Sequence, residues 1–379
     1  MQRQRTARRR QPVCIHREII AAGAGKAKCA ARSSATMRAA LRAGATQMKG
    51  FRGPRGRIGR VAMTFAVVPA RRSRFVPAAL GALAISLAAC STPSEAPAAA
   101  LPAAALDADF LLIGEIHDNA AQHRLRLHWL ETLAARRRVA LALEQFDAIR
   151  QGALDRARAA DAAAAAAGEP LARRARRIAE AAGFDFRGWH WEHYRPVVEL
   201  ALRLDLPLVA ANLSRAQTVA VARGTAPAES QPEDWGAAEQ RALETSIRDG
   251  HCGLLPESAI APMAAAQRSR DAQLARAIVD AHRRSGLPVV LLAGNGHQRR
   301  DVGVPRYLAK LAPGSRVFSI GLLAEDGAEG GEGAPDGPAG ALRFRQRYDF
   351  VAVTPQAPRA DPCEGLRAKT PQRPAAAPR

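Results

Sequence analysis

Short apolar runs alternate with longer amphipathic stretches between residues 106 and 353. The runs are apolar throughout rather than at every second position, which is typical of strands buried on both faces of a parallel sheet. The alternation predicts an α/β fold, with a mainly parallel central sheet and helices on both of its faces. The expected strands are Phe110–Ile113, Val139–Leu143, Leu208–Ala211, Val289–Ala293 and Val317–Ile320.

The amphipathic stretches between these strands are expected to be helices. One further stretch is rich in alanine and is predicted to be helical by propensity alone. Residues 325–340 are rich in Gly, Glu, Asp and Pro, which predicts a surface loop. The expected helices are Ala121–Ala135, Asp155–Gly168, Pro170–Ala182, Val197–Leu204, Trp235–Arg248 and Ile260–Ser285.

The formal net charge of +21 would by itself favour a nucleic-acid partner. Its distribution argues against that interpretation. Residues 1–90 hold 19 Lys and Arg against one acid, Glu18, whereas the remainder of the chain carries only +3. Because the basic excess lies upstream of Cys90, we expect no nucleic-acid partner for the folded part.

The upstream region has the order of a bacterial lipoprotein signal peptide. The cationic Arg71–Arg74 precedes the apolar run Phe75–Ile85, and small residues then lead to Cys90. This pattern predicts a signal peptide over residues 63–90 and a lipid on Cys90, which would anchor the chain in the bacterial cell envelope. The alternative is a short buried helix with an incidental cysteine. Residues 1–62 are interpreted as a gene start assigned too far upstream or as a disordered basic extension.

The remaining segments divide by composition. Residues 91–105 are rich in Pro and Ala and are predicted to form a flexible tether. Residues 106–353 are expected to form one domain, and residues 354–379 a tail. Cys252 and Cys363 are an even pair in an oxidising periplasm, which favours a disulfide bond. Two free thiols are the alternative.

Two Gly-x-x-His tetrads, Gly114–His117 and Gly294–His297, each follow a predicted strand. We therefore expect their strands to lie side by side and to share a site, because ligands bind beyond the carboxyl ends of parallel strands. Two histidines and two carboxylates at one rim would suit acid/base chemistry or a divalent metal such as Mn, Co or Zn. These candidate ligands are His117, His297, Glu115 and Glu144.

Each residue of the rim also has a structural interpretation. Asp118 and Asn119 could cap the following helix, and Glu144 could pair with an arginine. A further candidate group spans Gln267 to Asp271, where helical spacing favours an ordinary solvated face. His251 and Cys252 are adjacent, but no second cysteine nearby completes a zinc site, so Cys252 is read as half of a disulfide.

Aromatic residues are only 4% of the chain, yet they gather between Trp189 and Pro196. One interpretation is core packing of a turn that opens a helix at Pro196. The other is a flat apolar ligand held between rings, because tyrosinate and histidine both ligate haem iron and arginine suits propionates. The candidate haem-binding residues are Tyr194, His193, His190, Arg195 and Trp191.

Several of these segments, in order, carry a family resemblance. The chain resembles the ChaN family of haem-binding, iron-regulated bacterial lipoproteins. That family belongs to a wider group with the TIKI metalloproteases, the TraB-type proteins and the erythromycin esterases, and the paired tetrads are the mark of the group. The matching segments are Gly114–Asn119, Leu143–Gln145, Trp191–Ala201, Ala211–Arg215, Ala266–Asp271 and Gly294–Pro305.

The resemblance implies an α/β fold with a surface haem site, which two subunits with stacked haems could share, and a role in bacterial haem or iron uptake at the outer membrane. A tyrosine is the implied iron ligand, and Tyr194 fits best, with His193 or His190 assisting. An outer-membrane haem receptor and a second copy of the chain are the implied protein partners. On this view the chain binds haem without turnover. The alternative is a divalent-metal-dependent hydrolase, protease- or esterase-like, with Glu115 or Glu144 as ligand or general base.

Overall fold

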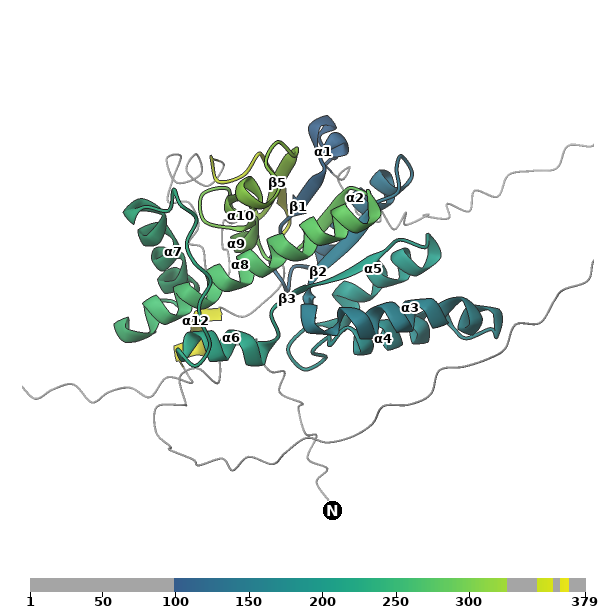
Figure 1. Ribbon diagram of the computed structural model, residues 1–379, viewed down its shortest axis with the longest axis horizontal. Helices are drawn as coiled ribbons and strands as arrows, with labels where there is room; N and C mark the ends of the chain where they lie inside the picture. The colour runs from purple at the N-terminus through teal and green to yellow at the C-terminus, as the bar shows by residue number, and fades with distance from the viewer. Residues whose placement is uncertain (1–98, 326–345, 357–361, 368–379) are drawn as a thin grey trace, which may run out of the picture. The chain divides into compact units, whose positions relative to one another are not determined.

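The structure is a computed structural model that describes residues 99–325, 346–356 and 362–367. Its centre is a six-stranded parallel sheet in the order β3-β2-β4-β1-β5-β6 (Figure 1). The predicted fold class is thereby confirmed. The strands are β1 (Phe110–Ile113), β2 (Ala140–Asp147), β3 (Leu208–Asn212), β4 (Val289–Leu292), β5 (Val317–Ala324) and β6 (Phe350–Thr354).

Helices connect the strands, and the long helix α8 crosses the sheet in Figure 1. A short 3-10 turn, Ala148–Arg150, links β2 to α3. The helices are α1 (Ala103–Asp107), α2 (Ala120–Ala134), α3 (Gln151–Ala166), α4 (Leu171–Ala181), α5 (Trp191–Arg203), α6 (Arg215–Ala222), α7 (Ala237–Gly250), α8 (Glu257–Ser285), α9 (Asn295–Gln298), α10 (Val304–Leu311) and α12 (Pro362–Arg367).

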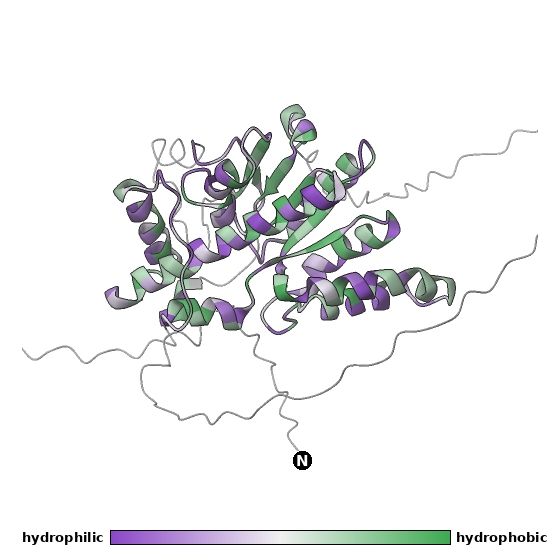
Figure 2. Cartoon of the chain, in the orientation of Figure 1, coloured by the Kyte–Doolittle hydropathy of each residue, from purple (hydrophilic) through white to green (hydrophobic). Residues whose placement is uncertain are grey.

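Both faces of the sheet are buried, as the continuous apolar runs predicted. Leu111 and Ile113 of β1 point to one face and pack in a core that includes α2, α4 and α5. Phe110 and Leu112 point to the other face and pack with α8 and α10. The strands are accordingly among the most hydrophobic segments (Figure 2). Each fully buried Leu, Ile or Phe contributes about 1.5–3 kcal/mol relative to an exposed one.

The predicted end of β2 is wrong. The strand continues through Glu144 to Asp147, although its apolar run stops at Leu143. Its pairing with β3 shifts register between Leu143 and Asp147, so the backbone stays extended after regular pairing has ended. Glu144 therefore lies within β2, one residue beyond the last pair of β2 with β4, Leu143 with Leu292.

The start of α5 also differs from the sequence interpretation. The helix begins at Trp191 with His190 as its N-cap residue, and Pro196 lies inside it. The proposal that Pro196 opens a helix is therefore wrong. Apolar periodicity marks only the later turns, where Val197 and Val198 are buried. Strand β6 and the short helices α1, α6, α9, α10 and α12 were not predicted.

The two tetrads follow neighbouring strands, as predicted. Strand β4 lies between β1 and β2, and Ile113 of β1 pairs with Leu292 of β4. The chain leaves β1 toward β2 on one side and leaves β4 toward β5 on the other. Such a reversal opens a crevice at the carboxyl ends of the strands, where ligands bind in open α/β sheets.

Cys252 and Cys363 form a disulfide bond, with their Cα atoms 5.7 Å apart. The bond joins the turn between α7 and α8 to α12. Cys90, the predicted signal peptide and most of the tether and tail lie outside the described residues, as does most of the predicted 325–340 loop. None of the helices in the described ranges is long and apolar enough to span a bilayer.

Candidate functional site

The polar residues beyond β1, β2 and β4 form a buried rim along the carboxyl edge of the sheet. Glu115 and His117 come from the segment after β1, Glu144 and Gln145 from the end of β2, and His297 from α9. Apart from His117, these residues are no more than 4% exposed. Gly114 follows β1 directly, and Gly294 follows β4 after Ala293.

Glu115 is the centre of the first half of the rim. The hydroxyl of Tyr194 donates to its Oε1 at 2.6 Å, and His117 Nδ1 donates to the same oxygen at 2.6 Å. The guanidinium of Arg126, which is fully buried on α2, forms an ion pair with Oε2. One carboxylate therefore ties α2 and α5 to the end of β1.

His123 is held as a neutral imidazole beside this carboxylate. Arg126 Nη2 can only donate, so His123 Nδ1 accepts from it at 3.2 Å. The proton then lies on Nε2, which donates to the backbone oxygen of His117 at 3.0 Å. Burial lowers the pKa of His123 to about 4. A charged His123 would lose its contact with Arg126.

Glu144 is the centre of the second half. Its Oε2 accepts the backbone N–H of Gly294 at 2.8 Å, and its Oε1 forms an ion pair with Arg270 and lies 3.4 Å from His297 Nε2. His297 Nδ1 lies 2.5 Å from Asp271 Oδ1. Two carboxylates thus enclose two cations. Gln267, Arg270 and Asp271 of this helix, whose face was predicted to be solvated, are instead directed into the rim.

The pKa values of His297 and Glu144 show how the charges in this half of the rim stabilise one another. Burial alone would lower the pKa of His297, but the carboxylates of Glu144 and Asp271 raise it to about 9. Burial alone would raise the pKa of Glu144, but His297 and Arg270 hold it well below its usual range. Burial raises the pKa of Asp271, although His297 acts in the opposite direction. At neutral pH Glu144 is therefore ionised and His297 protonated, and their charges are paired inside the protein.

The glycines of the tetrads allow the two halves to interlock. A Cβ on Gly294 would lie 2.9 Å from His117 Cε1 and 3.0 Å from its Nε2. A Cβ on Gly114 would collide with the side chain of Asn295. The Asn295 side chain is structural, because its amide group forms hydrogen bonds with both the backbone N–H and the backbone carbonyl of Leu322 in β5. Asn119 is likewise a cap, since its Oδ1 accepts the N–H groups of Ala121 and Gln122.

The expectation of a divalent metal is not supported. Within residues 99–325, 346–356 and 362–367, no three His, Cys, Asp or Glu side chains are arranged to hold a metal ion. The physical reason lies in the donors. Arg270 and the Gly294 N–H occupy the oxygens of Glu144, and Arg126, Tyr194 and His117 occupy those of Glu115. A cation would have to displace arginines that already neutralise both carboxylates.

The structure does not bring the five predicted haem-binding residues onto one surface. Tyr194 is 1% exposed, within the Glu115 network. The ring of Trp191 packs against that of Phe184, with 5.2 Å between centroids, and also contacts the core. Arg195 forms ion pairs with Glu192 and Glu199 of its own helix, at 2.8 and 3.0 Å. To bind haem propionates, as the sequence suggested, Arg195 would therefore have to give up its ion pairs with Glu192 and Glu199.

His190 and His193 do reach the surface. His190 is exposed, and His193 is partly buried with its ring stacked on His123, at 4.5 Å between centroids and 8° between planes. Burial lowers the pKa of His193 to about 4, and the nearby His123 adds to the effect. Trp189 precedes His190 in the chain and lies edge-on to His117, with 4.7 Å between ring centroids. We call His117, Trp189, His190 and His193 the histidine face.

The histidine face fits the chemistry of haem. The macrocycle needs apolar contact and its iron needs a donor, and neutral imidazole is a common donor to haem iron. In the part of the chain that the structure describes, the ring nitrogens of His190 and His193 have no hydrogen-bond partner. Their lone pairs are therefore not already engaged.

Sequence reasoning did not identify Arg126 and His123 as members of the site, and it placed Asp271 in a candidate group but favoured a solvated helix face for it. Arg126 and His123 lie on α2. A polar residue on such a helix is normally predicted to face solvent, yet these two residues are 0% and 6% exposed. One signal was available, since Asn119, His123 and Arg126 recur at helical spacing just after the first tetrad. Nothing in the local sequence marks Asp271 as buried.

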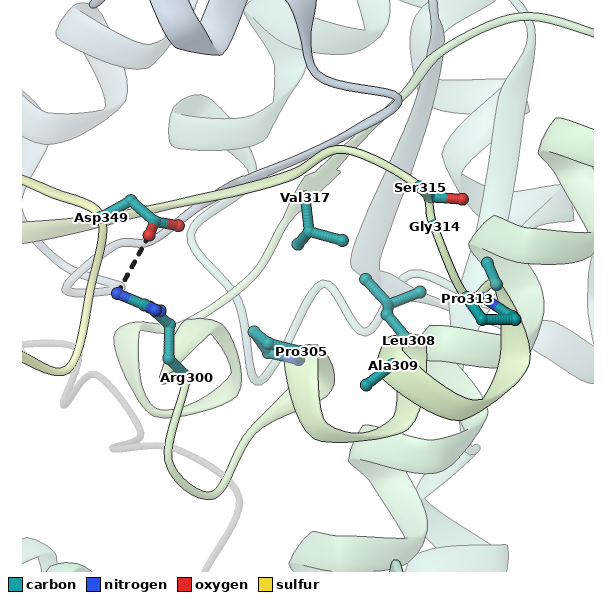
Figure 3. A pocket seen from close by; sticks show the side chains of 10 residues that line it. Arg300, Pro305, Leu308, Ala309, Pro313, Gly314, Ser315, Val317 and Asp349 are labelled. Carbon is teal, nitrogen blue, oxygen red and sulfur yellow. Dashed lines mark ion pairs between the residues drawn. The ribbon is translucent and has the colours of Figure 1, made fainter.

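A surface pocket of about 430 Å³ lies elsewhere, near the amino end of β5 (Figure 3). An ion pair of 3.1 Å between Arg300 and Asp349 closes one side of it. It carries no imidazole and is separate from the rim. The lining residues are Arg300, Pro305, Leu308, Ala309, Ala312, Pro313, Gly314, Ser315, Val317 and Asp349.

A parallel sheet with a charge-balanced rim and an adjacent histidine face defines an α/β protein of the ligand-binding, open-sheet class. The chain belongs to the family of haem-binding uptake proteins of the Tiki superfamily, ChaN, whose family model matches residues 101–308. This confirms the expected family.

Two solved structures are similar to the chain. One, from Campylobacter jejuni, is described as cofacial heme binding to ChaN; it is 22% identical, covers 57% of this chain and 82% of its own, and has a TM-score of 0.49. The other is a mutant of the erythromycin esterase EreC in its open conformation. It is 14% identical, covers 58% of this chain and 71% of its own, and has a TM-score of 0.35. No curated protein matches the chain.

Proposed function

We propose that this protein binds haem on the histidine face and serves haem or iron uptake at the envelope of a bacterial cell, held to the outer membrane by a lipid on Cys90. The family match over residues 101–308 supports haem as the ligand. The observation that carries the location is the pair of imidazoles, His190 and His193, that reach the surface with their rings 5.6 Å apart.

Haem supplies a flat apolar surface and an iron atom with open axial positions. The residues of the histidine face would hold it by ring contact from Trp189 and by an imidazole nitrogen. The low pKa of His193, about 4, keeps that imidazole in the form that can donate to iron at neutral pH. A second copy of the chain and an outer-membrane haem receptor are the proposed protein partners.

Titration of the purified full chain with hemin tests the haem proposal. We expect a saturable Soret band at one haem per chain. The double variant His190→Ala/His193→Ala should weaken binding, because it removes both free imidazoles. His128→Ala is the matched control, since His128 is an exposed histidine on α2 and lies outside the histidine face. A wild-type spectrum identical to that of free hemin would refute the proposal.

The lipid anchor rests on the order of Arg71–Arg74, Phe75–Ile85 and Cys90. Expression in a bacterium supplied with labelled palmitate should yield a labelled chain that fractionates with membranes. Cys90→Ala should abolish both the label and the fractionation. A wild-type chain recovered without label in the soluble periplasmic fraction would contradict the anchor and would leave the haem proposal standing.

A further inference from the structure

The first described residues of the chain are fastened near the end of the sheet where the strands begin. Ala99 and Leu101 pack against the core, and the indole nitrogen of Trp129 on α2 donates to the carbonyl oxygen of Ala99 at 2.6 Å. Helix α1 follows directly and leads into β1. Figure 1 shows α1 at one end of the strands and α6, which follows β3, at the other. The segment that comes from Cys90 therefore joins the domain on the side away from the rim.

The loops that precede the strands meet at this end of the sheet, and together they form what we call the amino edge. Two guanidinium groups join three of these loops. Arg137 donates to the backbone oxygen of Ala108, and Arg138 donates to that of Asp205, each at 2.7 Å. Because β1, β4 and β2 are neighbours and β5 pairs with β1, the other loops lie beside them. The amino edge comprises residues 107–109, 135–138, 203–207, 282–288 and 312–316.

The amino edge is rich in arginine. Its five segments hold seven arginines against three aspartates, a formal charge of +4. Residues 114–119 and 144–147, at the opposite edge, hold four acids and no Lys or Arg. The fold therefore separates charge along the direction of the strands, although the residues after Cys90 carry only +3 in all.

Three of these arginines are exposed and lack an acidic partner. Arg136, Arg283 and Arg284 form no ion pair within residues 99–325, 346–356 and 362–367. Arg283 donates to the backbone oxygen of Leu311 at 2.7 Å, which holds its side chain but leaves its charge without a counterion. An anionic partner could bind these guanidinium groups without breaking an ion pair, and guanidinium suits phosphate in particular.

A large apolar side chain stands among these charges. Leu204, the residue after α5, is 47% exposed and is one of three large hydrophobic residues classed as exposed in the described part of the chain. It lies between Arg203 and Asp205, the residue that Arg138 contacts. Apolar side chains surrounded by arginine suit the headgroup region of a bilayer, because the apolar group enters the acyl boundary while the guanidinium groups meet phosphate.

We infer that the amino edge rests on a membrane surface of anionic phospholipid, with its exposed arginines on the lipid phosphates. This inference rests on the proposed lipid anchor and adds the orientation of the domain. Cys90 lies nine residues before Ala99, and nine residues span at most about 30 Å. A lipid on Cys90 would therefore hold the domain close to the bilayer, and the arginines would orient it. The rim and the histidine face then point away from the membrane.

Hydrogen exchange of the full chain, purified from the bacterium and mixed with vesicles, tests this orientation. The probes are phosphatidylcholine vesicles with and without phosphatidylglycerol. We expect backbone exchange in residues 135–138 and 282–286 to slow on the anionic vesicles only. Exchange in residues 144–150, at the opposite edge, should be the same on both. Added salt should reverse the slowing, because it screens exposed charges.

The triple variant Arg136→Gln/Arg283→Gln/Arg284→Gln should lose the slowing. Each arginine near an anionic surface strengthens binding about fivefold, so the loss of three should shift the docking equilibrium by roughly a hundredfold. All three side chains are exposed, so their replacement leaves the core intact.

The matched control is Arg187→Gln/Arg223→Gln/Arg241→Gln, which removes the same charge from exposed positions outside the amino edge and should keep the slowing. Equal exchange on the two kinds of vesicle, or equal loss of slowing in the two triple variants, would overturn the inference. If the chain carries lipid, either result leaves the anchor standing. A chain without lipid that still shows slowing at the amino edge would support the membrane surface and overturn the anchor alone.

Discussion

The ionised state of His297 predicts a specific loss of stability in mild alkali. Its pKa is raised from 6.5 to about 9 by Glu144 and Asp271. Because the folded chain holds this proton more tightly than the unfolded chain, the stabilisation is fully present below pH 6.5. It is lost as the pH rises from 6.5 to about 9. At about 1.4 kcal/mol for each pKa unit, the loss amounts to about 3 kcal/mol.

Urea unfolding of the full chain at a series of pH values from 6 to 10 measures this loss. The free energy of unfolding of the wild type should fall across the window, and that of His297→Gln should change much less. The other histidines with shifted pKa values do not interfere, because the pKa values of His117, His123, His193 and His251 are all lowered and these residues titrate at more acidic pH.

The control for this series is His128→Gln, which removes an exposed histidine of α2 and should retain the wild-type slope. The variant His297→Gln should also be less stable than the wild type at pH 6, since it leaves Asp271 buried without its charged partner. Equal pH slopes in the wild type and His297→Gln would refute the view that a buried imidazolium holds the second half of the rim.

Three further substitutions test other buried contacts. Tyr194→Phe removes a hydrogen bond to a carboxylate and should lower the free energy of unfolding by about 1.5–3 kcal/mol in urea melts; no change would mean that Glu115 does not depend on this donor. Arg270→Met leaves Glu144 without its guanidinium and should cost about 3–5 kcal/mol by thermal unfolding, and a cost below about 1 kcal/mol would contradict the paired network. Cys252→Ser removes a disulfide between residues 111 positions apart and should lower the free energy of unfolding by about 2–5 kcal/mol. Dithiothreitol should cause the same loss in the wild type and no further loss in the variant.

The fold could be predicted because its strands are buried on both faces and therefore read as continuous apolar runs. Strand β1 was predicted at its observed bounds, Phe110–Ile113, and β4 within one residue. Prediction failed where polar residues continue an element. Glu144 extends β2 through a register shift, and Trp191 begins α5 before any apolar period is established.

The site was predictable only in part, because burial of a charge depends on partners distant in sequence. The tetrads pointed to Glu115 and His117. Arg126, in contrast, is predicted from sequence to be a solvated helix residue, because its burial depends on β1 and α5. The same holds for Asp271, which is 1% exposed against His297. Local sequence identified the strand ends correctly, whereas the charge balance that decides their chemistry comes from α2 and α8.

This charge balance explains how a rim with two Gly-x-x-His tetrads can support the proposed haem-binding surface. A dication placed at Glu144 would meet Arg270 and a protonated His297, so binding would require both cations to leave a buried site. The same ionic contacts hold helices in place. Arg270 and Asp271 attach α8 to the rim, as Arg126 and Tyr194 attach α2 and α5. The rim therefore acts as a rigid base for the histidine face, and disrupting it should alter haem binding through the position of α5 rather than through a lost ligand.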